Sequence, residues 1–400
     1  MSNPESNQVS SLDPYQPLSW YLQPGHDEIS PKAHELLIAE RTVPVRINED
    51  LSLRPKIIDA CGMTCDFCHN EGTPVRTDNI LGKAPDIGPG RSGRVSIFVR
   101  RNGVDFLPGR MEPNNDFSLA LSSLKTVLGL EEVHLTGGEP TLHPNLPALV
   151  DVSSQLGYRV NMTSNGENGG ARIRESALRG LGNITFSIFG TTPEELATTQ
   201  GPKYGDNLDL AAKRIQSLKE SIDIALENKV RVSANIVVPN IDHTQKVINI
   251  LDGFNPELGV KILNSLDDGD RSYYAIYELL SELDAEPNER IMTAGSSSTR
   301  VSYILPDGRK VYFKQIRPAR LPEICNNCQF NNPDDCKEGL YGLRLYVDTN
   351  GTYKVGVCIQ RMDLSMDLDK FVDSDLPAQI VQNRKRELSE MTSYFEPLSE

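Results

Sequence analysis

The chain has 400 residues, a formal net charge of −14, 38% hydrophobic and 24% charged residues. This length predicts two or three domains, and the acidic excess argues against a large nucleic-acid backbone interface. No apolar run approaches a membrane span, and the polar N-terminus lacks a signal-peptide pattern. We therefore expect a cytoplasmic protein with no nucleic-acid and no membrane partner.

Residues 1–50 are polar and weakly periodic, and are expected to form an N-terminal extension whose later part packs on the body. From residue 51 to 268, six β-branched runs alternate with helical patterns. Asp116 and Asn145 are predicted helix N-caps, and Gly129 and Gly157 C-terminal stops. The alternation predicts an α/β fold with a parallel sheet of βαβ units. Right-handed crossovers would curl it into a complete or partial barrel. The six strands are expected at 56–59, 132–136, 159–163, 184–189, 230–238 and 260–263, and the helices at 117–128, 146–156, 172–181, 208–227 and 244–251.

An insertion at 74–115 interrupts this alternation with glycine, proline and arginine. Asn102-Gly103 predicts a hairpin turn within it. Five arginines of this stretch would form either an anion clamp or a solvated loop: Arg91, Arg94, Arg100, Arg101 and Arg110.

Residues 269–400 are expected to form a small C-terminal domain. A helix is predicted at 273–283 and another at 378–388. Between them, two hairpins are predicted on either side of a cysteine-containing stretch, one at 301–314 and one at 343–357.

All seven cysteines fall into two groups. The first has the spacing C-x3-C-x2-C just after a strand, at Cys61, Cys65 and Cys68. Three thiolates from one loop can bind a cubane cluster and leave one iron open to a small molecule. The alternative is a structural zinc site, for which His69 is the available fourth ligand.

A Gly-Gly-Glu-Pro turn, Gly137 to Pro140, ends the second predicted strand. Its glycines let the backbone approach a ligand closely, and the carboxyl edge of a barrel sheet is where such folds place their sites. The Glu139 carboxylate can take an ammonium group. Polar residues recur at the ends of the next strands: Thr163, Ser164, Asn165, Ser187 and Asn235.

Together these motifs resemble the radical S-adenosylmethionine (radical SAM) superfamily, with its C-x3-C-x-aromatic-x-C hallmark. The resemblance implies a partial (β/α)6 TIM-like barrel and a 4Fe-4S cluster on Cys61, Cys65 and Cys68. It implies that S-adenosylmethionine is cleaved to a 5′-deoxyadenosyl radical, which abstracts a substrate hydrogen. The implied cofactor-binding residues are Phe67, Gly137, Gly138, Glu139, Pro140, Thr163, Ser164, Asn165, Ser187 and Asn235.

The second cysteine group has the spacing C-x2-C-x7-C-x21-C, at Cys325, Cys328, Cys336 and Cys358. It resembles the C-terminal auxiliary-cluster domains of radical SAM enzymes, of the Twitch or SPASM kind, and most closely the GTP 3′,8-cyclase branch. That branch has three such cysteines, so Cys336 either closes a second 4Fe-4S cluster or is free. A four-cysteine zinc knuckle is the alternative.

The resemblance favours a radical SAM enzyme that drives cyclisation, carbon–carbon bond formation or rearrangement of a small metabolite or nucleotide. Its implied cofactors are two 4Fe-4S clusters and S-adenosylmethionine, and its implied partner is an electron donor of the flavodoxin or ferredoxin type. Two alternatives stay open: a maturase of a ribosomally made precursor peptide, and a non-catalytic iron–sulfur or zinc interaction protein. His69 and His143 are candidate proton-transfer residues.

Overall fold

A computed structural model describes residues 13, 15–17, 29–63, 65, 109–200, 202–266, 268–332, 335–336 and 338–395. Their strands are β1 (Val45–Glu49), β2 (Ser52–Ile58), β3 (Glu132–Gly137), β4 (Arg159–Ser164), β5 (Leu181–Ser187), β6 (Arg231–Val238), β7 (Gly259–Asn264), β8 (Glu286–Ala294), β9 (Ser298–Ile304), β10 (Lys310–Ile316), β11 (Leu343–Val347), β12 (Tyr353–Gly356) and β13 (Met366–Asp367).

The helices of the described residues are α1 (Pro31–Ala39), α3 (Asn115–Leu128), α4 (Leu146–Gln155), α5 (Ala171–Ala177), α6 (Pro193–Gln200), α7 (Pro202–Gly205), α8 (Leu208–Glu227), α9 (Thr244–Gly253), α10 (Asp270–Glu282), α11 (Pro322–Cys325), α12 (Leu368–Asp373) and α13 (Leu376–Phe395). Three short 3-10 helices are η4 (Pro140–Leu142), η5 (Ile241–His243) and η6 (Met362–Leu364). None of the described helices is both long and apolar enough to cross a membrane.

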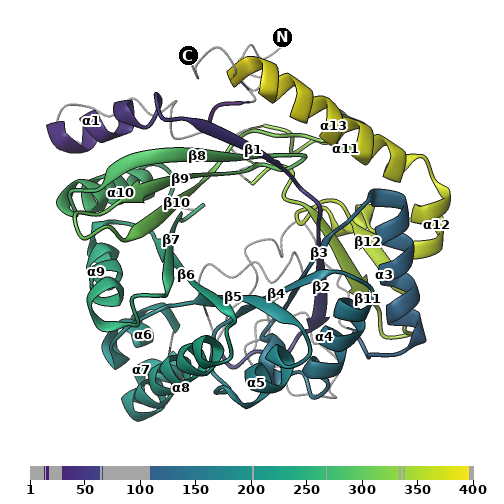
Figure 1. Cartoon of the computed structure of the whole chain (residues 1–400), viewed down its shortest axis with the longest axis horizontal. Coiled ribbons are helices and arrows are strands. Elements are labelled where there is room, and N and C mark those ends of the chain that lie inside the picture. The colour runs from purple at the N-terminus through teal and green to yellow at the C-terminus, as the bar shows by residue number, and fades with distance from the viewer. Residues whose placement is uncertain are drawn as a thin grey trace, which may run out of the picture.

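The described strands join one sheet in the order β1-β8-β9-β10-β7-β6-β5-β4-β3-β2-β11-β12-β13. Its middle, β2 to β7, is wholly parallel. Figure 1 shows the sheet curled around the centre of the molecule with helices outside it. The six predicted strands and the curled α/β barrel are confirmed. The crossover helices bury one face each, as βαβ units require.

Helix α3 illustrates how the sequence produces these crossovers. Its buried side chains, Phe117, Ala120, Leu121, Leu124 and Leu128, recur every three or four residues and form one apolar stripe. The side chain of Asn114 accepts a hydrogen bond from the amide of Phe117 and caps the helix. The predicted N-cap, Asp116, was wrong, because Asp116 lies inside the first turn of the helix. Gly129 ends the helix in the left-handed region at φ 65°, as predicted.

The sheet continues beyond residue 268 on both of its sides. Strand β10 pairs in parallel with β7, and β9 and β8 follow in antiparallel order. On the other side β11 pairs in parallel with β2, and β12 extends it as a hairpin. Both predicted C-terminal hairpins are therefore present, and they belong to the barrel sheet.

Strand β1 was not predicted, although it lies in the segment expected to pack on the body. It pairs with β8 at one edge of the sheet, and only Asp50 and Leu51 separate it from β2. Just before it, the buried Glu40 carboxylate accepts hydrogen bonds from the hydroxyl groups of Tyr277 (2.8 Å) and Tyr303 (2.5 Å). Glu40 and β1 thus hold this segment against α10, β8 and β9.

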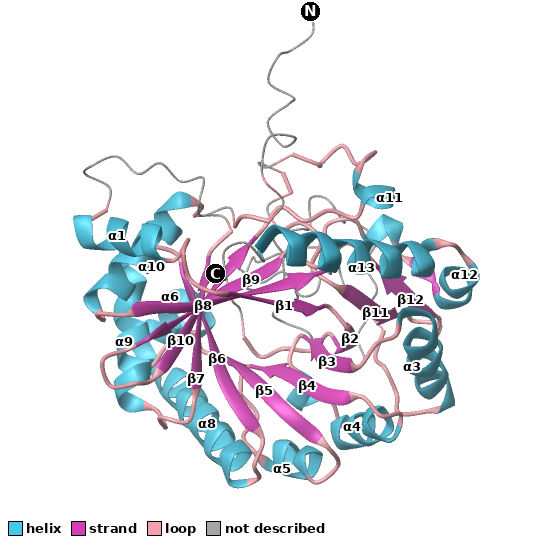
Figure 2. Cartoon of the chain, turned by 45° about the horizontal axis from the view of Figure 1, so that its top comes forward, coloured by secondary structure: helices cyan, strands magenta, loops and turns pink. Residues whose placement is uncertain are grey.

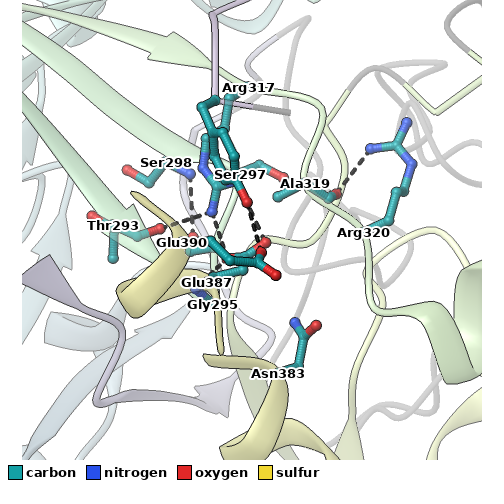
Figure 3. Close-up of polar contacts among 12 residues, drawn as sticks. Thr293, Gly295, Ser297, Ser298, Arg317, Ala319, Arg320, Asn383, Glu387 and Glu390 are labelled. Carbon is teal, nitrogen blue, oxygen red and sulfur yellow. Dashed lines mark hydrogen bonds and ion pairs between the residues drawn. The ribbon is translucent and has the colours of Figure 1, made fainter. Parts of the chain in front are cut away.

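Helix α13 lies across β1, β8 and α3, and Figure 2 shows it spanning that side of the barrel. It begins before and ends after the predicted range 378–388, so the helix is longer than expected. Its Glu387 carboxylate pairs with the fully buried guanidinium of Arg317 at 2.7 Å (Figure 3). The same carboxylate accepts a hydrogen bond from the amide of Gly295, and Arg317 also donates to the carbonyl of Thr293. This ion pair joins α13 to the strands it covers.

Candidate active site

A cavity of about 390 Å³ occupies the lumen of the barrel and the carboxyl ends of its strands. This volume lies within the range of small-molecule sites. It is lined by side chains of β2 to β7, β9 and β10, by the first cysteine loop, and by the segment that precedes β11. Of the residues predicted from the sequence, it collects Cys61, Cys65, Gly137, Gly138, Glu139, Thr163, Ser164, Asn165, Ser187 and Asn235.

The first cysteine loop reaches the cavity with Cys61 and Cys65. The Nε2 group of Gln200 donates a hydrogen bond to Sγ of Cys65 at 3.0 Å, and Nδ2 of Asn165 lies 3.6 Å from Sγ of Cys61. Cys68, Phe67 and His69 lie outside the described residues.

Residues that the sequence did not indicate hold this loop. The amide of Gly62 donates to the Glu167 carboxylate at 2.7 Å, and the Tyr204 hydroxyl donates to the carbonyl of Gly62 at 2.9 Å. Glu167 is buried and follows the predicted Asn165-Gly166 pair directly. The loop therefore depends on side chains from the β4 end and from α6 and α7.

The Gly137-Gly138 pair has a structural reason that the sequence did not show. A Cβ on Gly137 would lie 2.2 Å from the carbonyl oxygen of Ile58, and one on Gly138 would lie 2.4 Å from that of Asp59. Here the chain leading to Cys61 runs alongside the end of β3, and the amide of Gly138 donates a hydrogen bond to the carbonyl oxygen of Ile58 at 2.8 Å. The glycines thus let two backbones meet and fix the cysteine loop over the strand ends.

Glu139 connects the ends of β3 and β4. Its Oε1 atom accepts hydrogen bonds from the amide and hydroxyl of Thr141 and from the hydroxyl of Ser164 (2.7 Å), while Oε2 accepts one from the amide of Asn165 (2.6 Å). Burial raises the pKa of Glu139 to about 7, the negative charge of Glu167 adds to the rise, and these hydrogen bonds oppose it. A cation at this carboxylate would relieve the cost of its charge.

The remaining predicted residues lie on neighbouring strands. Ser187 and Asn235 face each other in register on β5 and β6, and the Thr163 hydroxyl is 2.7 Å from Nε2 of His134. Pro140 is buried at the start of η4 and does not line the cavity. His143 is also buried away from it, and contacts the Met111 carbonyl through Nε2 and the Asn145 amide through Nδ1.

Basic side chains line the other part of the cavity: Arg54, Lys261, Arg300 and Lys314. Burial, together with the nearby charges of Arg300 and Lys314, lowers the pKa of Lys261 to about 8. Burial also lowers the pKa of Arg300. Within the described residues, its Nε has no hydrogen-bond partner. Alternate residues of β9 and β10 line the cavity: Ser298 and Arg300 on β9, and Tyr312, Lys314 and Ile316 on β10. Because alternate residues of a strand share one face, this period of two is the sequence signal that could have indicated them.

Among the five arginines considered for an anion clamp, only Arg110 lies within the described residues. It pairs with Glu112 and is not part of the cavity lining.

The second cysteine group lines a separate, smaller cavity with apolar neighbours such as Phe330 and Val357. Burial raises the pKa of the Cys358 thiol to about 11 and also raises that of Cys325, and the other thiols of the group add to both. The Arg361 guanidinium lies 3.5 Å from Sγ of Cys328. As placed in the described part of the chain, no three of these side chains converge as they would on a single metal ion.

The segment from Glu338 to Tyr341 lies between the two sites. Glu338 and Tyr341 line the large cavity, whereas Gly339 and Leu340 line the second-cysteine cavity. None of the four cysteines is part of the large cavity's lining. The short segment thus forms a wall between them.

A profile of the radical SAM superfamily matches residues 56–254, which contain the first cysteine group and the strand-end motifs. The chain belongs to the radical SAM superfamily. It is accordingly a radical SAM enzyme that uses S-adenosylmethionine and a 4Fe-4S cluster. This confirms the predicted class and excludes the non-catalytic alternative.

Among curated proteins, this radical SAM enzyme is similar to probable GTP 3′,8-cyclases. One from Metallosphaera sedula is 24% identical over 327 residues, covering 79% of this chain and 83% of that protein. One from Saccharolobus islandicus is 26% identical over 324 residues, covering 79% of this chain and 85% of that protein. Among solved structures, Streptococcus suis SuiB matches with a TM-score of 0.45 at 16% identity, covering 88% of this chain and 71% of that one.

Proposed function

We propose that this radical SAM enzyme acts on a small anionic metabolite, such as a nucleotide or another phosphate or carboxylate compound. The supporting observation is the set of basic side chains, Arg54, Lys261, Arg300 and Lys314, that shares one cavity with the strand-end motifs. These side chains are half-buried around one cavity, and partly desolvated cations favour a bound anion because they are costly without one. Hydrogen abstraction would then drive cyclisation, carbon–carbon bond formation or rearrangement.

Cys61, Cys65 and Cys68 are the proposed ligands of the catalytic cluster, with Phe67 beside it. The proposed S-adenosylmethionine site comprises Gly137, Gly138, Glu139, Thr163, Ser164, Asn165, Ser187 and Asn235, with Pro140 supporting the turn. Glu139 suits an ammonium group because its buried carboxylate lines the cavity and, among the described residues, Oε2 accepts one hydrogen bond. When bound, the two groups supply the 5′-deoxyadenosyl radical that abstracts the hydrogen.

We propose a second 4Fe-4S cluster on Cys325, Cys328, Cys336 and Cys358. All four thiols share one cavity with apolar neighbours and an arginine donor, which suits an iron–sulfur cluster. Ligation by Cys336 would leave no open iron, and the wall from Glu338 to Tyr341 separates this site from the large cavity. The cluster would then carry electrons or stabilise the fold without touching substrate.

The electron donor is proposed to be a flavodoxin or ferredoxin, and the location the cytoplasm. Seven cysteines confined to two ligand-like groups suit a reducing compartment.

The test begins with anaerobic reconstitution of the enzyme and measurement of its iron and sulfide content. Binding of pyrophosphate, which serves as an anionic probe, is then measured. Wild-type enzyme is expected to bind pyrophosphate, and Lys261→Gln to bind it about 10–100-fold more weakly, the value of one or two charged hydrogen bonds. Lys310→Gln is the matched control, because Lys310 is exposed on the neighbouring strand β10.

Substrate candidates are then compared by formation of 5′-deoxyadenosine and of a modified product. Product from an anionic small molecule supports the proposal. Equal pyrophosphate binding by both lysine variants, or product only from a precursor peptide, overturns it.

A further inference from the structure

Tyr341 lies in the wall segment before β11, and its ring is surrounded by cations from three strands. Its hydroxyl contacts Nζ of Lys314 on β10, and that nitrogen lies 4.2 Å from the ring centroid. The guanidinium carbon of Arg54 on β2 is 5.6 Å from the centroid, and that of Arg344 on β11 is 5.9 Å away. Tyr341 therefore reaches from the β11 side of the barrel to the β10 side.

This residue belongs to the proposed substrate site, because it lines the large cavity together with Arg54 and Lys314. A phenol beside an ammonium and two guanidinium groups can lose its proton and become their counter-charge. An anionic ligand entering the cavity would be attracted to the same cations. Phenolate and ligand then compete, and two negative charges at this point would repel each other.

We propose that Tyr341 is a proton-linked anion-binding residue: its phenolate and the anionic group of the substrate compete for the same cations. The substrate therefore binds the form in which the phenol is protonated. In that step a proton from solvent forms the O–H bond of Tyr341, with no redox change, and the hydroxyl donates a hydrogen bond to the anion. This inference rests on the anionic substrate class proposed above.

The charges around Tyr341 support this linkage. Burial raises the pKa of Tyr341, but Lys314 and Arg54 outweigh it and hold the pKa below the ordinary tyrosine value. Glu338, in the same segment, opposes them. Arg300 on β9 also interacts with Tyr341. In contrast, burial raises the pKa of Tyr158, Tyr273 and Tyr353.

The first measurement is the tyrosinate ultraviolet difference spectrum of the reconstituted enzyme during an alkaline titration. In wild-type enzyme one tyrosinate is expected to form before the others, and Tyr341→Phe is expected to remove it. Tyr346→Phe is the matched control, since Tyr346 is buried on β11 and is not part of the cavity lining. Saturating pyrophosphate should shift this early titration to higher pH.

The second measurement is pyrophosphate affinity against pH, with calorimetry in two buffers of different ionisation enthalpy. Above the pKa of Tyr341, wild-type affinity should fall about tenfold per pH unit with proton uptake on binding. Affinity of Tyr341→Phe should fall less steeply and with less proton uptake over the same range, because in that variant Lys261, whose pKa is about 8, still loses its charge while residue 341 no longer titrates.

Failure of the Tyr341 proposal and failure of the anionic-substrate proposal give different experimental results. Absence of an early tyrosinate overturns the role of Tyr341, and so does an early tyrosinate that bound pyrophosphate leaves unchanged. If an early tyrosinate forms but pyrophosphate does not bind at all, the proposals of an anionic substrate and of its proton linkage are overturned. Only the lowered pKa of Tyr341 is then supported.

Discussion

Gln200 donates a hydrogen bond from Nε2 to Sγ of Cys65 at 3.0 Å. Gln200 is fully buried at the end of α6, so this contact is shielded from water. A donor at a thiolate ligand stabilises the reduced, more negative state of an iron–sulfur cluster and raises its reduction potential.

Gln200→Leu is therefore expected to lower the reduction potential of the catalytic cluster. Loss of a hydrogen bond of about 1 kcal/mol corresponds to roughly 40 mV for a one-electron couple. A redox titration followed by electron paramagnetic resonance measures it. Gln216→Leu on the exposed face of α8 is the control, and equal potentials in both variants would exclude the assigned contact.

Glu139 is expected to make S-adenosylmethionine binding pH-dependent. Its pKa of about 7 means that the carboxyl is largely neutral below pH 7 and charged above it. A neutral carboxyl cannot pair with the ammonium of the ligand, so affinity should fall by up to about tenfold per pH unit below this pKa. Equilibrium dialysis between pH 5.5 and 8.5 measures this, within the pH range that the reconstituted cluster survives.

Glu139→Gln should bind S-adenosylmethionine weakly and with a flat pH profile. Glu132→Gln, on the same strand but away from the cavity, should keep the wild-type profile. A flat profile in wild-type enzyme would show that the carboxylate does not meet the ammonium.

Cys336→Ala tests whether the fourth thiol closes the second cluster. If Cys336 is a ligand, the variant gains an iron site open to small molecules, and added azide or cyanide should change the resonance spectrum of that cluster. The wild-type spectrum should not respond. Identical behaviour of the two proteins, with equal iron content, would mean that Cys336 is not a ligand.

Glu387→Ala is expected to destabilise the fold by about 3–5 kcal/mol, because it leaves the buried Arg317 charge without its carboxylate. Denaturant unfolding measures this loss. The control is Glu390→Ala on an exposed position of the same helix, expected within about 1 kcal/mol of wild type. Similar losses in both variants would assign the effect to the helix surface and not to the ion pair.

The barrel core was predictable from sequence because its strands and helices carry strong local patterns. The strand-end motifs were predictable for a related reason: in parallel strands, residues such as Ser187 and Asn235 must emerge at one edge. The cap at Asn114 shows the usual limit, since neighbouring polar residues compete for one position and tertiary packing decides.

The basic half of the cavity was not predictable in the same way. The predicted hairpin places Arg300 beside Lys314, but Lys261 joins them only when β10 pairs with β7, a pairing that no local pattern specifies. Gln200, Tyr204 and Glu167 act on the cysteine loop through tertiary contacts alone. Because residues 269–400 were expected to form a small C-terminal domain, β9 and β10 were not expected to line the same cavity as β2 to β7.

The pairing of β1 with β8 also bears on how the chain reaches its native state. Val45 pairs with Arg290, and β1 further contacts α13 at the far end of the sequence. During synthesis, β1 leaves the ribosome long before either partner exists. Contacts of such sequence separation slow folding. Pairing of β1 at the edge of the sheet is therefore a late event, and β1 stays unpaired until β8 and α13 have been made.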